Sequence, residues 1–231
     1  GQAPNDMNRG VVPGDAFDSR PYVRASPPDP ENRTDHVMTH IRVNPASMTA
    51  YGRQATEIFA QIHSELSQLV DTVTQVQYFG PHAVEFKTRC GLLAQTFAQN
   101  VLTDISAMAE AVRVSVSNIQ AALGGAMVAI EVSGRPIEAP AVATTDYVDV
   151  DTTALEAIIA PVGARFTALQ ARLDDHLSRL ASTDWEGNAK QQAVALVTGF
   201  TAQAKERCVE AENAISTHIA DQLASVVAAD V

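Results

Sequence analysis

The chain has 231 residues, of which 46% are hydrophobic, and this is long enough to bury a substantial core in one or two domains. Its formal net charge of −11 argues against nucleic acid or anionic lipid as the main partner, because both require a basic face. The sequence holds no apolar run of about 18 residues and no secretory h-region, so it predicts neither a transmembrane helix nor a cleaved signal peptide.

The N-terminal region is expected to be an arm followed by a helix. Residues 1–42 hold six of the eleven prolines and show no helical period, so we expect them to form a disordered arm. Order is expected to begin at Val43, with Asn44 as a helix N-cap and Pro45 at the first helical position. Apolar residues then recur every three or four positions over 48–76, which predicts a long amphipathic helix.

A second helix is predicted directly after the first. Gly80 and Pro81 end the first apolar stripe, and a longer stripe follows over 83–123. Gly124 and Gly125 are expected to end this second helix. Two long helices joined by a short loop predict an antiparallel helical hairpin.

The second half of the chain follows the same plan. Asp151 is expected to cap a helix whose apolar stripe runs over 155–180. Residues 183–187 interrupt the stripe, and a final helix is expected over 193–226. The sequence therefore predicts a second helical hairpin.

Laying one half of the sequence on the other reveals an internal repeat at an offset of 107 residues, without insertion. The equivalent pairs include Asn44 and Asp151, Phe59 and Phe166, Leu66 and Leu173, Tyr78 and Trp185, and Gly80 and Gly187. The repeats span 43–124 and 150–231, and segment 125–149 is expected to be a linker between them.

The two interhelical loops share an aromatic-x-Gly sequence, which is Tyr78-Phe79-Gly80 in the first repeat and Trp185-Glu186-Gly187 in the second. Glycine supplies the backbone freedom for a sharp reversal, and the large ring covers the open end of the hydrophobic seam. Taken alone, such a tripeptide is weak evidence, and the alternative is that these are ordinary turn residues. Their occurrence midway in two Ala-rich, acidic helix-loop-helix repeats is more specific.

In that setting the sequence resembles the WXG family, the early-secreted-antigen-like (ESAT-six-like) proteins exported by type VII (ESX) secretion systems of mycobacteria and other Gram-positive bacteria. Trp185 and Gly187 match the family motif, whereas the first repeat has Tyr78 where the family has Trp. Family members form dimers of two hairpins packed antiparallel. The resemblance, which covers 43–124 and 150–231, thus implies an all-α fold, a four-helix bundle that is an intramolecular pseudo-dimer.

The length of the linker tests that arrangement. In antiparallel hairpins the open end of one lies beside the turn of the other, so the linker must run back along the helices. A helix of about 32 residues is roughly 48 Å long, whereas 25 extended residues reach about 80 Å. Parallel hairpins need only a few linking residues, so the linker favours the antiparallel arrangement.

Part of the linker is expected to have structure of its own. Residues 127–137 are apolar and β-branched enough to form a short strand or hairpin that lies on the helices. The alternative is that the preceding helix overruns Gly124 and Gly125 by a turn.

Many family members carry a second export element, Tyr-x-x-x-Asp/Glu, after the last helix, with both side chains on one helical face. Residues 228–231 lack it. Tyr147 and Asp151 have the spacing and are the candidate export motif, although Asp151 is better explained as a helix cap preceded by extended chain.

The sequence shows no catalytic constellation, so we expect no enzyme, cofactor or metal site. It contains no nucleophile elbow, phosphate-binding glycine loop or inward Glu-x-x-His pair. Cys90 and Cys208 are expected to be buried and too far apart for a disulfide. His63, His176 and His218 flank the apolar stripes and are expected to be partly exposed.

Two functions of different classes follow from these expectations. The first is a non-enzymatic WXG-like protein, secreted or at the cell surface, which acts as substrate or associated factor of a type VII system. Its partner is a secretion ATPase or a cognate secreted protein. This partner is expected to bind Tyr78 and Trp185, which serve as exposed anchors. The second is a cytoplasmic structural or adaptor bundle, associated with a phage or toxin operon and not exported. In either case we expect a monomeric pseudo-dimer, with higher oligomers left open.

Overall fold

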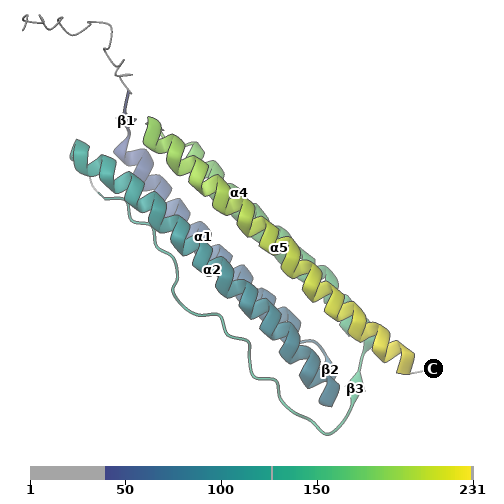
Figure 1. The fold of residues 1–231 in the computed structure, drawn as a ribbon. Coiled ribbons are helices and arrows are strands. Elements are labelled where there is room, and N and C mark those ends of the chain that lie inside the picture. Colours follow the sequence, from purple (N-terminus) through teal and green to yellow (C-terminus); the bar gives the residue numbers. More distant parts are fainter. Residues whose placement is uncertain (1–39, 126, 230–231) are drawn as a thin grey trace, which may run out of the picture. The chain divides into compact units, whose positions relative to one another are not determined.

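The computed structural model describes residues 40–125 and 127–229, and this part of the chain is all-α with a few short strands (Figure 1). Residues 1–39 of the predicted arm lie outside the described residues. Among the described helices, none combines the length and the apolar character needed to cross a membrane.

The first two helices begin and end close to where the sequence predicts. Helix α1 spans Pro45–Thr74, and the Asn44 side chain accepts hydrogen bonds from the first-turn amides of Ala46 and Ser47. Helix α2 spans Pro81–Leu123 and ends at Gly124, which has the left-handed backbone of a helix C-cap. The helix therefore does not overrun its glycines.

The second half contains helices α3 (Thr152–Ala157), α4 (Ile159–Ala181) and α5 (Asn188–Ala229). Asp151 caps α3 as predicted, because its side chain accepts hydrogen bonds from the amides of Thr153 and Ala154. The single helix expected over 155–180 is broken at Ile158. Pro161 explains the break, since it has no N–H to donate to the Ala157 carbonyl one turn earlier.

Four two-residue strands join the halves in two antiparallel pairs. Strand β1 (Arg42–Val43) pairs with β4 (Trp185–Glu186), and β2 (Tyr78–Phe79) pairs with β3 (Asp149–Val150). The sequence repeat extends to these strands, because β1 and β3 are equivalent at the 107-residue offset, as are β2 and β4. Strand β1 begins at Arg42, one residue ahead of the boundary expected at Val43.

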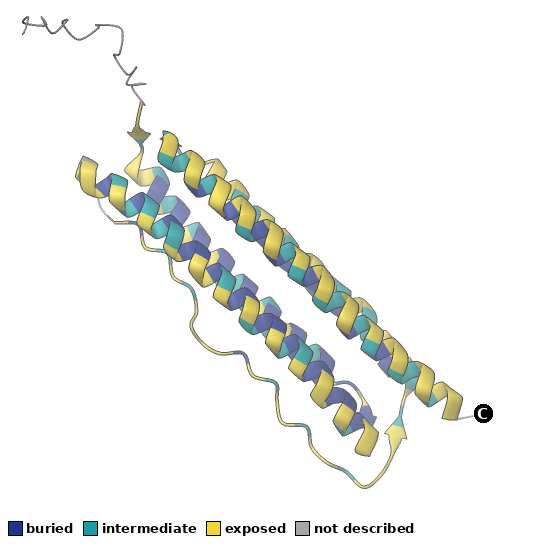
Figure 2. Cartoon of the chain, viewed as in Figure 1, coloured by how far each residue is buried: buried dark blue, intermediate teal, exposed yellow. Residues whose placement is uncertain are grey.

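Each long helix packs against two others. Helix α1 contacts α2 of its own half and α4 of the other half. Helix α5 contacts α4 of its own half and α2 of the other half (Figure 1). The pairing of β1 with β4 places the start of α1 beside the end of α4, so these two helices run antiparallel. The buried faces of the helices turn toward one another (Figure 2). The largest fully buried side chains are Trp185, Tyr51, Phe59, Phe86, Phe166 and Met48.

The linker runs back along α1 and α2 without regular structure until it reaches β3. The Glu131 amide donates to Thr56 Oγ1 at 3.0 Å, and Gln99 Nε2 donates to the Ile137 carbonyl at 3.2 Å. The linker lies so close to α1 that a Cβ at Gly52 would sit 2.6 Å from the Ala129 carbonyl oxygen.

The prediction of a strand or hairpin over 127–137 is wrong, because these residues form neither strand nor helix. The neighbours of this segment are helices, whose backbone groups bond within the helix and offer no edge for pairing. Two of the apolar residues that suggested a strand, Val128 and Ile137, are buried in the core instead, whereas Met127 is 68% exposed.

The cysteine prediction is confirmed. Cys90 and Cys208 are buried and form no disulfide. Burial raises the pKa of both thiols to about 12, so neither is a thiolate near neutral pH.

Two glycines give a matched test of the turn geometry. Gly187 has a φ of 124°, a region that L-residues rarely adopt, although its nearest neighbouring atoms leave room for a methyl group. We expect Gly187→Ala to lower the free energy of unfolding by about 1–3 kcal/mol through backbone strain alone. Urea unfolding monitored by circular dichroism measures the change.

Gly199→Ala is the control, because Gly199 lies within α5 with open space around it. We expect this substitution to raise the free energy of unfolding by about 0.5–1 kcal/mol. Equal effects of the two substitutions would contradict the assigned backbone conformation.

Candidate functional site

The two aromatic-x-Gly turns form the candidate site, and each is built from both halves of the chain. The first turn end consists of Tyr78, Phe79 and Gly80 with strand β3. The second turn end consists of Trp185, Glu186 and Gly187 with strand β1. The labels β1 and β3 in Figure 1 mark the two ends.

The expectation that Tyr78 and Trp185 are exposed anchors is wrong. Only 3% of Tyr78 and 1% of Trp185 is exposed. The cause lies in the strands, since Val150 pairs with Tyr78 and Val43 pairs with Trp185, which closes each turn over the apolar core. The rings therefore position the turns, and a partner cannot contact them without opening the strands.

The second turn end is held by polar bonds to the start of α1. Asp184 Oδ1 accepts a 2.6 Å hydrogen bond from Arg42, and Oδ2 accepts one of 3.1 Å from Asn44. The Asp184 amide donates to Ser47 Oγ at 2.9 Å. The hydrogen bond from Asn44, together with the charge of Arg42, lowers the pKa of Asp184, so the ion pair persists in mild acid.

The first turn end is more apolar at its surface. Gln222 Nε2 of α5 donates to the Tyr78 hydroxyl at 2.8 Å, which ties the turn to the other half. Outside this contact, Tyr147 stacks on Phe79 with ring centroids 5.7 Å apart. Tyr147 is 59% exposed and Val148 is 71% exposed, so an apolar surface faces solvent here.

The candidate export pair does not lie on a helix. Asp151 is the N-cap of α3, and residues 149–150 before it form strand β3. Tyr147 therefore precedes the strand and does not share a helical face with Asp151. The alternative reading of Asp151, as a cap preceded by extended chain, is confirmed.

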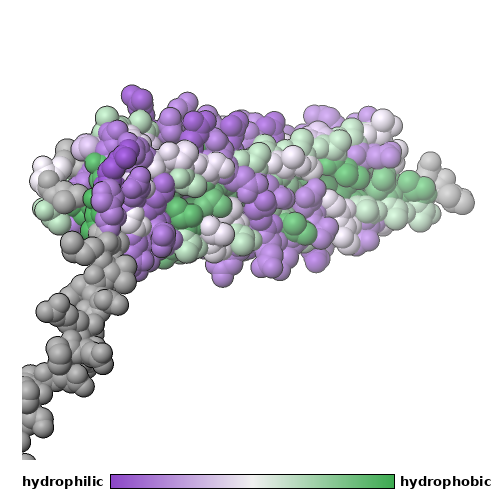
Figure 3. Space-filling model, turned by 90° about the horizontal axis from the view of Figure 1, so that it is seen from above, coloured by the Kyte–Doolittle hydropathy of each residue, from purple (hydrophilic) through white to green (hydrophobic). Residues whose placement is uncertain are grey.

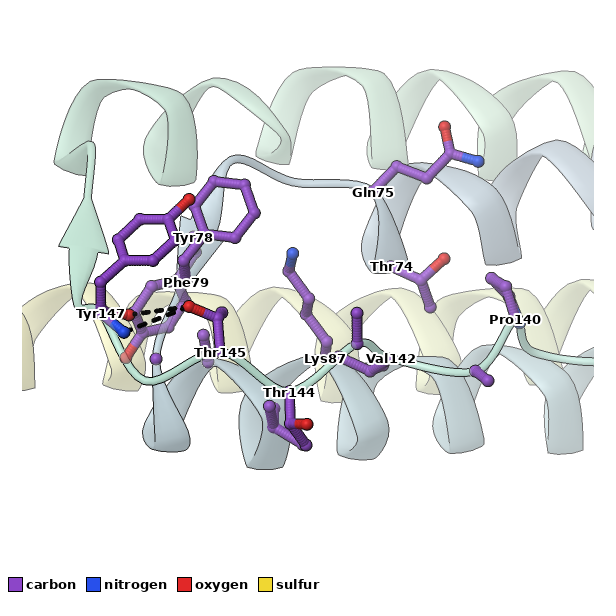
Figure 4. Close-up of a pocket in the computed structure, with 15 residues that line it drawn as sticks. Thr74, Gln75, Tyr78, Phe79, Lys87, Pro140, Val142, Thr144, Thr145 and Tyr147 are labelled. Atoms are coloured by element: carbon purple, nitrogen blue, oxygen red, sulfur yellow. Dashed lines mark hydrogen bonds between the residues drawn. The ribbon is translucent and has the colours of Figure 1, made fainter.

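Beside the first turn end, the structure has a pocket of about 340 Å³ that the sequence did not predict. The turn, the first two turns of α2 and linker residues 140–145 line it (Figure 4). Lys87 reaches into it from α2, with Nζ 5.0 Å from the centroid of the Phe79 ring. Burial lowers the pKa of the Lys87 amine. The sequence does not single out Lys87 as a pocket residue. Neither repeat pattern nor motif includes it, and the equivalent residue in the second repeat is Val194.

The burial of a second polar group, the imidazole of His176, was not predicted from the sequence either. His176 was expected to be partly exposed but is 1% exposed, and its Nε2 lies 2.9 Å from the Tyr51 hydroxyl. The ring contacts Phe59 at a centroid distance of 4.7 Å. Its position follows from helical spacing, because His176 stands three residues after the stripe residue Leu173. Burial lowers the pKa of His176 to about 4.

The comparisons with known proteins add no identity. No family model matches the chain, and neither the curated proteins nor the solved structures searched gave a match. In 40–125 and 127–229, no three or more His, Cys, Asp or Glu side chains gather where they could hold a metal ion.

The buried histidine predicts a loss of stability in acid. The folded protein holds a neutral imidazole down to a pH of about 4, whereas the unfolded chain takes up the proton below its ordinary pKa of 6.5. The contribution of His176 is therefore complete above pH 6.5 and declines as the pH falls toward 4, by up to about 3 kcal/mol.

We expect His176→Leu to flatten this part of the stability profile, measured by urea unfolding at pH 7, 5.5 and 4.5. Leucine suits the position, because the repeat equivalent of His176 is Leu69. His82→Gln, on an exposed side chain, controls for the loss of a histidine. An unchanged slope in the leucine variant would show that other groups cause the acid sensitivity.

Proposed function

We propose that the chain is a WXG-like protein in which two helix-turn-helix hairpins pack antiparallel as a four-helix bundle, the fused equivalent of a WXG dimer. The reciprocal strand pairs support this proposal most directly. Each turn pairs with the strand that precedes the first helix of the other half, β2 with β3 and β4 with β1. Such pairing brings the open end of one hairpin beside the turn of the other.

The linker and the helix bounds support the same arrangement. The linker runs back along α1 and α2 before it reaches β3, as antiparallel hairpins require. Helix α1 and the α3–α4 pair have bounds that differ by the repeat offset at both ends, since Pro45 corresponds to Thr152 and Thr74 to Ala181. The halves are thus built alike.

In this proposal the protein is a substrate or associated factor of a type VII secretion system. It is secreted or displayed at the cell surface, and it binds a secretion ATPase or a cognate secreted protein. Because the turn aromatics are buried, the recognition surface moves to their exposed neighbours, Tyr147 and Val148. An exposed aromatic ring on an ordered support is a typical binding hot spot.

Further exposed apolar side chains lie on α5, at Leu196, Val209 and Val227. Figure 3 shows apolar surface that becomes denser toward the C-terminal end. This end of α5 lies near the first turn end, because Gln222 bonds Tyr78. The first turn end thus offers an apolar surface for a protein partner.

A cytoplasmic adaptor bundle of a phage or toxin operon is the second candidate. One observation favours it: Tyr147 and Asp151 do not form the helical pair that an export element of this family has. Adjacent genes for a secretion ATPase would favour the first candidate over this one.

The antiparallel arrangement predicts a long distance between the two turns. Spin labels at Gln77 and Asn188, both exposed, are expected to lie roughly 45 Å apart, the length of a 30-residue helix such as α1. Double electron–electron resonance measures the distance, in a background with alanine at both cysteines. Labels at Gln77 and Asp149, which belong to the same end, are the control and should lie far closer. Similar distances in both pairs would contradict the proposed bundle.

The secretion hypothesis predicts that export depends on Tyr147. In the producing cell, deleting the secretion ATPase gene should remove the protein from the culture filtrate. Tyr147→Ala should weaken binding to the purified partner about tenfold and reduce export, since it removes the exposed ring. Leu92→Ala is the matched control, because Leu92 is 60% exposed on α2. Unchanged secretion in the ATPase deletion would refute the type VII assignment.

A further inference from the structure

Lys87 is an unusual lysine because its side chain is 8% exposed and yet has no ionic partner. Within 40–125 and 127–229, no carboxylate or carbonyl forms an ion pair or hydrogen bond with its ammonium. The ammonium instead makes a cation–π contact with the Phe79 ring. Lys190 on α5 shows the ordinary solution, since its Nζ donates to the Thr183 carbonyl at 2.8 Å. The Lys87 ammonium faces the adjacent pocket, where no ion pair neutralises it, so the pocket offers a positive charge to an anion.

The pocket around Lys87 has room for that anion. Its volume of about 340 Å³ lies at the lower end of the range for small-molecule sites. Figure 4 shows Lys87 rising from α2 toward the turn, with linker residues Val142 and Thr144 beside the base of its side chain. Lys87 is the one charged residue among the described residues that line the pocket. The remaining lining is mostly apolar, which suits an organic ligand.

The start of α2 adds a second positive feature. Its N-cap is Gly80, which has no side chain to accept hydrogen bonds from the first-turn amides. In contrast, Asn44 and Asp151 cap α1 and α3 with their side chains. Gly80 and Ala83 line the pocket, so the partial positive charge of the helix N-terminus lies beside it.

We propose that this pocket binds a small apolar carboxylate, whose carboxylate pairs with the Lys87 ammonium and whose apolar body lies against Phe79 and linker residues 140–145. A single ammonium matches a single negative charge. A phosphate carries more charge and usually takes arginine or a glycine-rich loop, neither of which lines the pocket. The equivalent residue in the second repeat is Val194, so the second repeat lacks the ammonium that this site requires.

Binding of the carboxylate also involves the linker, because residues 140–145 form one wall of the pocket. Binding should therefore hold the linker against the turn and order the segment next to Tyr147. This proposal does not rest on the secretion hypothesis, since it concerns the charge and lining of the pocket alone.

The test uses the full chain with two probes of nearly equal size, 3-phenylpropionate and its neutral amide. Titrations followed by ¹H–¹⁵N NMR should show saturable shifts at Gly80, Lys87 and Thr144 with the carboxylate, and about tenfold weaker binding of the amide. Equal binding of the two probes, or no saturable shift at millimolar concentration, would overturn the proposal.

Variants separate the charge from the shape of the pocket. Lys87→Met should weaken carboxylate binding about tenfold while the protein stays folded, because valine occupies the equivalent position in the second repeat. Lys190→Met, which removes the other amine near a turn, should leave binding unchanged. If Lys87→Met does not fold, Lys87→Arg, which keeps the charge, must retain a preference for the carboxylate over the amide. Undiminished binding in Lys87→Met would refute the assigned role.

Discussion

The rest of the structure depends on the reciprocal pairing of each turn with the strand that begins the other half. The two pairs are only two residues long, yet they set the direction of every helix, because each strand is continuous with a helix start. They also bury Tyr78 and Trp185, and the buried rings close the ends of the core. A change at one turn therefore acts on the start of the opposite half.

The two ends have diverged although their backbones are equivalent. At the second turn end, Arg42, Asn44 and Ser47 bond Asp184, so the surface there is polar and held by charge. At the first turn end the linker replaces those bonds, bringing Tyr147 onto Phe79 and closing a pocket over Lys87.

Much of the fold follows from local signals in the sequence. Asn44, Asp151 and Gly124 predict their helix ends because capping depends on residues within one turn. The break at Ile158 was missed, although Pro161 carried the signal. The strands and the pocket could not be predicted in this way, because residues 42 and 186, or 87 and 142, meet only through the packing of the whole fold. His176 had the spacing of a core residue, but its polarity suggested the surface.

The burial of Trp185 and Tyr78 changes what an aromatic-x-Gly motif means for this chain. A residue selected for contact with a partner must be reachable, and these rings are closed off by Val43 and Val150. Both rings belong to the core: the Tyr78 hydroxyl accepts a hydrogen bond from Gln222, and Trp185 is among the largest fully buried side chains. The motif thus reports how the turn is built. The surfaces of the two ends differ in chemistry, with an ion pair at Asp184 on the second and an exposed Tyr147 ring on the first.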